Sequence, residues 1–159
     1  MNLFSIHTTL LLFICFSFTI ITRGQSSNYF ENILTQRNLG KTITKRIGND
    51  ISQRTYLGTI RTKSGEIKYF VLKEFYRVKA AVVYHGHSRL IFCSPNKKIF
   101  AQYILDLPDQ LPYKLQQNIL YFAHKENGIL QRSQFELYDS LPKFMCFAPK
   151  NYCYEIGKE

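Results

Sequence analysis

The stretch that decides the fold is RTYLGTIRTKSGEIKYFVLKEFYRV, residues 54–78. It holds two runs rich in aromatic and β-branched residues, residues 54–62 and 66–78, which are joined by Lys63-Ser64-Gly65. Such runs on either side of a short, glycine-containing connection are typical of a β-hairpin.

Turn-forming sequences recur along the rest of the chain. They lie at residues 85–87 (His-Gly-His), 94–97 (Ser-Pro-Asn-Lys) and 125–128 (Lys-Glu-Asn-Gly), each between two apolar runs. A spacing of about ten residues between turns is typical of antiparallel sheets. The sequence therefore predicts a mainly β fold, an antiparallel meander that forms a small sandwich or barrel.

Residues 1–24 contain a long apolar run and end in Gly24, which is typical of a secretory signal peptide cleaved before Gln25. Because no Lys or Arg precedes the apolar run, an uncleaved membrane anchor is the alternative. We expect an exported protein, periplasmic or secreted, with no membrane span once the signal is removed.

Residues 25–52 are predicted to contain one short helix and a basic linker or edge segment. Asn28 and Glu31 have the spacing of a capping box, and Gly40 is a typical helix end. The β domain is then expected to span residues 53–159.

Positive charge is concentrated in the N-terminal half. The whole chain has 21 Lys and Arg against 11 Asp and Glu. Residues 25–79 hold 11 basic and 4 acidic residues, whereas residues 80–159 hold 9 and 7. This imbalance predicts an anionic partner, such as an envelope surface or an acidic glycan rather than a nucleic acid, although a merely solvated face is the alternative. The candidate binding residues are Lys41, Lys45, Arg46 and Arg54.

Glu74 is the one charged residue on an otherwise apolar and aromatic strand face, which includes Leu72 and Tyr76. Burying a carboxylate is costly unless it is paired. Two interpretations follow: an acid with a raised pKa in a pocket, which would suit a hydrolase, or a bulge that turns Glu74 to solvent. We favour the bulge, because unbroken strands of this length are unusual. Lys73, Phe75 and Arg77, beside it, could form a stacking platform or simply a packed face.

Two of the cysteines are predicted to form a disulfide. A tight turn at Pro149-Lys150 would place Cys146 directly opposite Cys153 on antiparallel strands, at a separation that a disulfide can bridge. Cys93 is expected to be a buried small hydrophobe, with pairing to either of the other two as the alternative.

The histidines offer a second candidate site. On a strand, His85 and His87 would share one face, and His124 could add a third ligand for zinc or copper, with Cys93 or Glu74 as a fourth. The favoured interpretation is a turn at Gly86, so no cofactor is predicted.

Function is predicted only as a class. The chain has no nucleophile elbow, P-loop or dinucleotide fingerprint, which argues against the common enzyme types that carry them. The leading hypothesis is a small exported binding or structural module whose basic half contacts an anionic envelope or extracellular partner. The alternative is a metal-binding or metalloenzyme domain that uses the His-x-His pair.

Removal of the signal is directly testable. The protein purified from its own export compartment should have an intact mass that corresponds to a chain beginning at Gln25, with two hydrogens missing for one disulfide. A mass that includes residues 1–24 would instead show a retained anchor.

Overall fold

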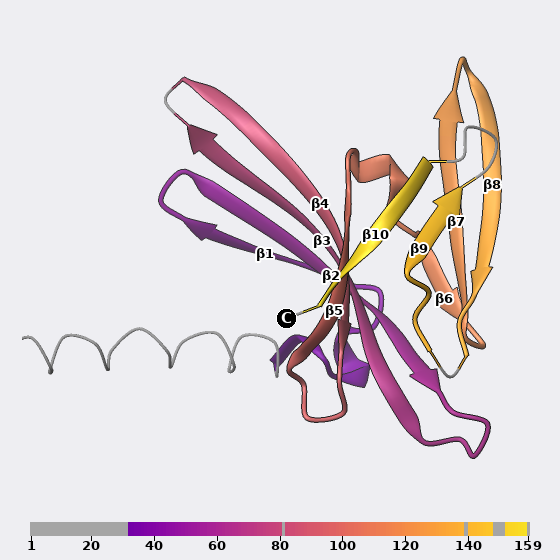
Figure 1. Cartoon of the computed structure of the whole chain (residues 1–159). Helices are drawn as coiled ribbons and strands as arrows, with labels where there is room; N and C mark the ends of the chain where they lie inside the picture. The colour runs from indigo at the N-terminus through magenta and orange to yellow at the C-terminus, as the bar shows by residue number, and fades with distance from the viewer. Residues whose placement is uncertain (1–31, 81, 139, 148–151, 159) are drawn as a thin grey trace, which may run out of the picture.

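The computed structural model describes residues 32–80, 82–138, 140–147 and 152–158 of the chain. In this part, antiparallel strands form two sheets (Figure 1). The larger sheet has seven strands in the order β1-β2-β3-β4-β5-β10-β9, and the smaller has three in the order β6-β7-β8. The strands are β1 (Thr42–Ile47), β2 (Asp50–Arg61), β3 (Ile67–Ala80), β4 (Val83–Cys93), β5 (Ile99–Leu105), β6 (Lys114–Gln116), β7 (Ile119–Glu126), β8 (Ile129–Glu136), β9 (Phe144–Phe147) and β10 (Tyr152–Lys158). The mainly β, antiparallel prediction is confirmed.

Three of the predicted turns join consecutive strands as expected. The β2–β3 turn is closed by a backbone hydrogen bond from Thr62 N to Glu66 O (2.9 Å), and the β4–β5 turn by one from Ser94 N to Lys98 O (2.9 Å). The β7–β8 turn has positive φ at Asn127 (50°) and Gly128 (81°), as a two-residue hairpin turn requires.

The turn expected at His85-Gly86-His87 is wrong, because all three residues lie inside β4. The turn that joins β3 to β4 comes earlier in the chain, before Val83. Gly86 is needed for packing instead: a Cβ there would lie 2.9 Å from Cε2 of Phe75, so the Phe75 ring covers the space that any other side chain would fill.

The helix expected to end at Gly40 is also not found in the described residues, and its predicted capping residues, Asn28 and Glu31, lie outside them. Asn32 and Ile33 are helical, and a short 3₁₀ turn, η1 (Gln36–Asn38), follows. Leu39 then forms a parallel bridge with Tyr56, so the segment is drawn along the edge of β2. The basic segment that follows forms the edge strand β1 rather than a linker.

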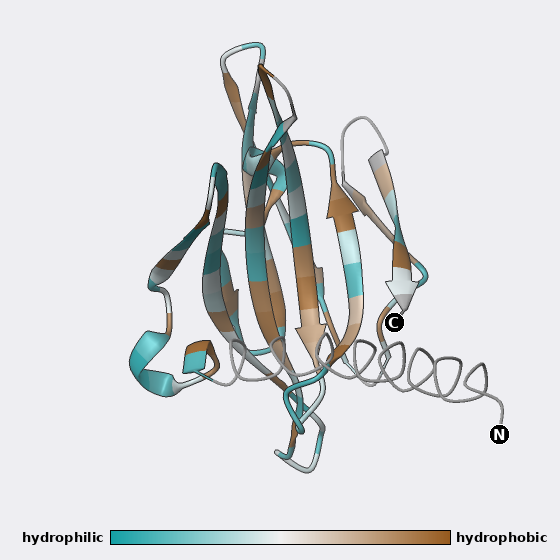
Figure 2. Cartoon of the chain, turned by 90° about the vertical axis from the view of Figure 1, so that its left-hand side faces the viewer, coloured by the Kyte–Doolittle hydropathy of each residue, from teal (hydrophilic) through white to brown (hydrophobic). Residues whose placement is uncertain are grey.

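Two apolar clusters lie on opposite faces of the large sheet. One fills the space between the sheets and includes Val71, Phe92 and Tyr103 of the large sheet and Leu120 and Phe122 of the small one. The other lies under the N-terminal segment and consists of Ile33, Leu34, Tyr56, Leu72, Ile91 and Cys93. Hydrophobic residues gather in the lower part of the central strands, and hydrophilic ones along their upper part (Figure 2). The sheet therefore extends beyond its core.

The predicted disulfide is confirmed between Cys146 and Cys153, which are directly paired across β9 and β10. The turn expected at Pro149-Lys150 lies outside the described residues. Cys93 is fully buried, in the cluster under the N-terminal segment, as expected for a small hydrophobe.

Replacing Cys146 and Cys153 with Ser should lower the free energy of unfolding by about 2.5 kcal/mol, because the closed loop is short. Urea unfolding of the double variant beside the wild-type protein measures this difference. Loss of all cooperative unfolding would show that the whole fold depends on the disulfide, contrary to this expectation.

Candidate functional site

Four strands of the large sheet, β1 to β4, continue past the apolar core and end in two hairpins that point the same way (Figure 1). We call this region the β1–β4 end; it comprises residues 42–54, 73–80 and 82–89. Within it β2 pairs with β3 from Arg54 opposite Glu74 to Ile51 opposite Arg77. Strand alternation gives this end two faces whose chemistry differs.

One face holds a buried ion cluster around Glu74, which is 1% exposed. Its carboxylate accepts hydrogen bonds from Arg54 Nε, from both Nε and Nη2 of Arg89, and from Ser52 Oγ at 2.9 Å. Arg89 also donates to Gln102 Oε1 at 3.1 Å. The cluster thus joins β2, β3, β4 and β5 side chain to side chain.

This cluster overturns both interpretations of Glu74. Burial by itself would raise the pKa of Glu74, but the charges of Arg54 and Arg89, with the hydrogen bonds from Arg54 and Ser52, outweigh it and lower the pKa. Glu74 is therefore an ionised, paired group and not a poised acid, and no bulge turns it to solvent. Arg54, expected to bind an anionic partner, is instead engaged in this ion pair, with its side chain 13% exposed.

The opposite face of the β1–β4 end combines cations with aromatic rings. We call it the basic face; it consists of Arg46, Lys73, Phe75, Arg77, Lys79, Tyr84 and Ser88. Register places Arg46 and Arg77 on either side of Ile51, and Lys79 directly opposite Tyr84. The guanidinium carbon of Arg77 lies 4.4 Å from the centroid of the Tyr84 ring, and Lys79 Nζ lies 5.9 Å from it. Both cations thus gather around one ring.

Some polar groups of the basic face lack partners. Arg77 Nε and Ser88 Oγ are buried without a hydrogen-bond partner among the described residues. Lys73 is half-buried, and desolvation lowers its pKa. Buried polar atoms usually have partners, so the basic face is less completely satisfied than a structural ion network.

Acidic groups do not neutralise the basic face. Its strand positions carry no Asp or Glu, and within the described chain the only carboxylate of the β1–β4 end besides Glu74 is Asp50. Asp50 accepts hydrogen bonds from Tyr76 Oη (3.2 Å) and from the backbone N of Lys79 (3.1 Å), on the other side of the sheet.

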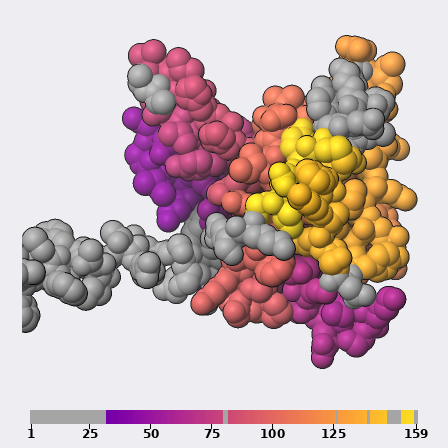
Figure 3. All heavy atoms as spheres, in the orientation of Figure 1, coloured from indigo at the N-terminus to yellow at the C-terminus, as the bar shows by residue number. Residues whose placement is uncertain are grey.

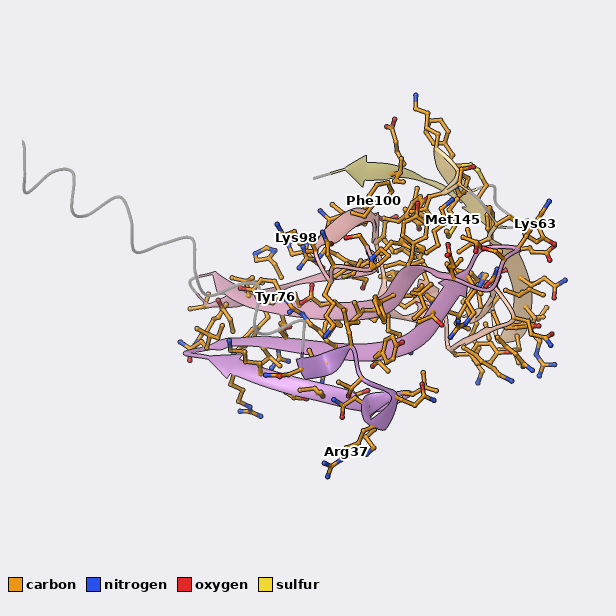
Figure 4. All side chains as sticks on the ribbon, turned by 90° about the horizontal axis from the view of Figure 1, so that it is seen from below. Arg37, Lys63, Tyr76, Lys98, Phe100 and Met145 are labelled. Carbon is orange, nitrogen blue, oxygen red and sulfur yellow. A yellow bond between two sulfur atoms is a disulfide. The ribbon has the colours of Figure 1, made fainter. Side chains whose placement is uncertain are left out.

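The basic face continues the sheet face that packs on the three-stranded sheet. Beyond the core it therefore looks toward the hollow that Figure 3 shows between the projecting strands, at left, and the later part of the chain, in orange. In Figure 4, Tyr76 of the β1–β4 end and Lys63 of the β2–β3 turn lie toward opposite ends of the sheet. The basic residues of that turn are therefore not part of the basic face.

The predicted binding residues are only partly brought together. Lys45 and Arg46 are exposed near the end of β1 that leads into the β1–β2 hairpin turn. Lys41 lies just before Thr42, at the opposite end of β1. Sequence reasoning did not name Lys79 and Tyr84 as binding residues. The strand alternation of residues 73–79 held the signal for Lys79, but Tyr84 was obscured because β4 was thought to turn at Gly86.

The predicted metal ligands are not brought together. His85 and His87 are exposed on β4, on the Glu74 side of the sheet, whereas His124 lies on β7 of the small sheet. Cys93 and Glu74 are both buried. The described residues contain no group of three or more His, Cys, Asp or Glu placed to hold a metal ion.

The small sheet has a shallow pocket of about 360 Å³, lined by Tyr113, Tyr121, Phe122, Arg132, Ser133 and Gln134.

Among the described residues no helix has the length and apolarity to cross a membrane. Comparison of the chain with known protein families, curated proteins and solved structures gives no match.

Replacing Glu74 with Gln should lower the free energy of unfolding by about 3 kcal/mol at neutral pH, because two partly buried arginines lose their counter-ion. The folded-state pKa of Glu74 is lowered, so its contribution is present above the unfolded value, about 4.3, and is lost as pH falls through the folded value. Urea unfolding at a series of pH values should therefore show the gap between wild type and Glu74→Gln closing in acid.

A gap that stays constant with pH would contradict this account. As a control, Glu74→Leu combined with Arg54→Met and Arg89→Met should recover much of the stability, since no unpaired charge remains buried.

Proposed function

We propose that the protein is an exported, non-enzymatic binding module that holds an anionic partner on the basic face. The observation that carries the proposal is the set of cations Arg46, Lys73, Arg77 and Lys79 on one sheet face, with no ion pair to any described residue. A structural ion network would pair them, as it pairs Arg54 and Arg89 on the other face.

The form of the site supports an oxyanion rather than a neutral ligand. Arg77 offers a planar donor group beside an aromatic ring, which suits carboxylate, sulfate or phosphate oxygens. The Tyr84 ring lies against one side of the Arg77 guanidinium, which reduces the hydration of that side and strengthens electrostatic attraction.

Export is part of the proposal. It is supported by the apolar run of residues 1–24 and by the Cys146–Cys153 disulfide, since disulfides persist in oxidising compartments. The net charge of +10 for the whole chain favours association with the anionic surfaces found there.

Neutralising the basic face should weaken binding to an anionic probe. Arg46→Gln, Arg77→Gln and Lys79→Gln together should reduce affinity for immobilised heparin by about tenfold or more at low salt, since each exposed charge contributes up to about 1 kcal/mol. Wild-type affinity should fall steeply as salt rises, and the dependence of the variant should be shallower. Heparin affinity measured over a salt series tests both expectations.

The matched control is Lys63→Gln, Lys98→Gln and Lys114→Gln, which removes the same charge from exposed positions away from the basic face. If the control loses as much affinity as the basic-face variant, net charge alone drives binding and the proposed site is wrong. Equal thermal unfolding midpoints of the two variants would show that the comparison is between folded proteins.

A further inference from the structure

The most exposed large hydrophobic side chains in the described residues lie at hairpin tips. They are Val82 at 88%, Ile129 at 64% and Ile47 at 60%. Val83 (55%) and Tyr84 (47%) follow Val82 on the same hairpin. Turns usually carry polar residues, so aliphatic side chains at this exposure call for a reason.

Two of these tips form one projecting edge. Ile47 ends β1, and Val82 lies between β3 and β4. The backbone N of Lys79 donates to Asp50 Oδ1 at 3.1 Å, which holds the start of β2 against the end of β3. Figure 1 shows the two hairpins reaching in the same direction. Among the described residues, Ile47, Val82 and Val83 therefore lie at the ends of these two hairpins.

Cations surround this apolar edge. Lys45 and Arg46 precede Ile47 on β1, and Arg77 and Lys79 approach the other tip on β3. The nearby carboxylate, Asp50, already accepts hydrogen bonds from Tyr76 and Lys79. Aliphatic side chains thus lie at the two hairpin tips, and positively charged side chains lie next to them, nearer the body of the sheet.

We infer that the anionic partner is a lipid bilayer: Ile47, Val82 and Val83 enter its interface while Lys45, Arg46, Arg77 and Lys79 contact acidic headgroups. The inference rests on the proposed function and narrows its partner. A bilayer suits both groups of side chains: the aliphatic tips reach toward its hydrocarbon, and the cations behind them meet its anionic headgroups. A soluble acidic glycan or other polyanion would use the charge but leave the aliphatic tips in water.

The first experiment measures partition of the processed chain onto vesicles. Wild type should bind vesicles of phosphatidylcholine with phosphatidylglycerol and not vesicles of phosphatidylcholine alone. The Val82→Ser, Val83→Ser double variant should bind the anionic vesicles at least tenfold more weakly, because two aliphatic side chains no longer leave water. Its affinity for heparin should not change, because its charge is that of the wild type.

The second experiment uses the lack of tryptophan in the chain. Val82→Trp introduces the one tryptophan of the chain at the inferred membrane edge, where it can be excited selectively over tyrosine, and Ile129→Trp introduces one at the β7–β8 tip as a matched control. The emission of Val82→Trp should shift to the blue on anionic vesicles, whereas that of Ile129→Trp should not.

The outcomes distinguish a failure of the membrane inference from a failure of the proposed function. Vesicle binding by Val82→Ser, Val83→Ser equal to the wild type, or the same blue shift at both tryptophans, would overturn the membrane edge. Binding to heparin without binding to anionic vesicles would overturn it in favour of a soluble polyanion and leave the proposed function standing. Binding to neither probe would overturn the proposed function itself.

Discussion

The structure depends on one buried carboxylate that is shared by two arginines from the flanking strands. Glu74 lies at the point where the apolar core of the large sheet ends, and Arg54 of β2 and Arg89 of β4 both donate to it. A slip of one residue in either pairing would turn an arginine to the opposite face and leave the carboxylate without that partner, at the cost of an uncompensated buried charge. The cluster therefore fixes the register of three strands where apolar packing no longer does. This specificity is what allows β3 to run for 14 residues without a break.

Much of the fold was predictable because local signals and tertiary structure agree. The residues at 54–78, the turns at residues 94–97 and 125–128, and the Cys146–Cys153 pair each combine strand propensity with a turn that fits it. The predicted helix does not continue to Gly40 in the described residues, because the pattern that predicted it is local, whereas the burial of Ile33 and Leu34 in one cluster with Leu72 and Ile91 is not. Tertiary contacts decided its conformation.

The candidate site was only partly predictable, for a related reason. Gly86 resembles a turn glycine, but its role depends on Phe75, which is 11 residues away in the chain and is seen only once β3 and β4 are paired. The same pairing brings Tyr84 to Arg77 and Lys79. The exclusion of Arg54 from the site likewise requires Glu74, since an arginine in a basic segment has no local mark that separates a partner of a buried acid from a partner of an external anion. The amino-acid composition predicted the positive charge, but only the strand register shows which face of the sheet carries it.

The buried ion cluster and the basic face are connected through their charges. The cluster joins two arginines to one glutamate, so it keeps one net positive charge within the sheet, directly behind the cations of the basic face. Like charges on both sides of the same strands repel, which destabilises this end of the sheet. The end stays folded because the hydrogen bonds of Glu74 hold β2, β3 and β4 together against that repulsion. An anion on the basic face would relieve it, so the arrangement that strains the isolated protein is also the one that increases its attraction for a negatively charged partner.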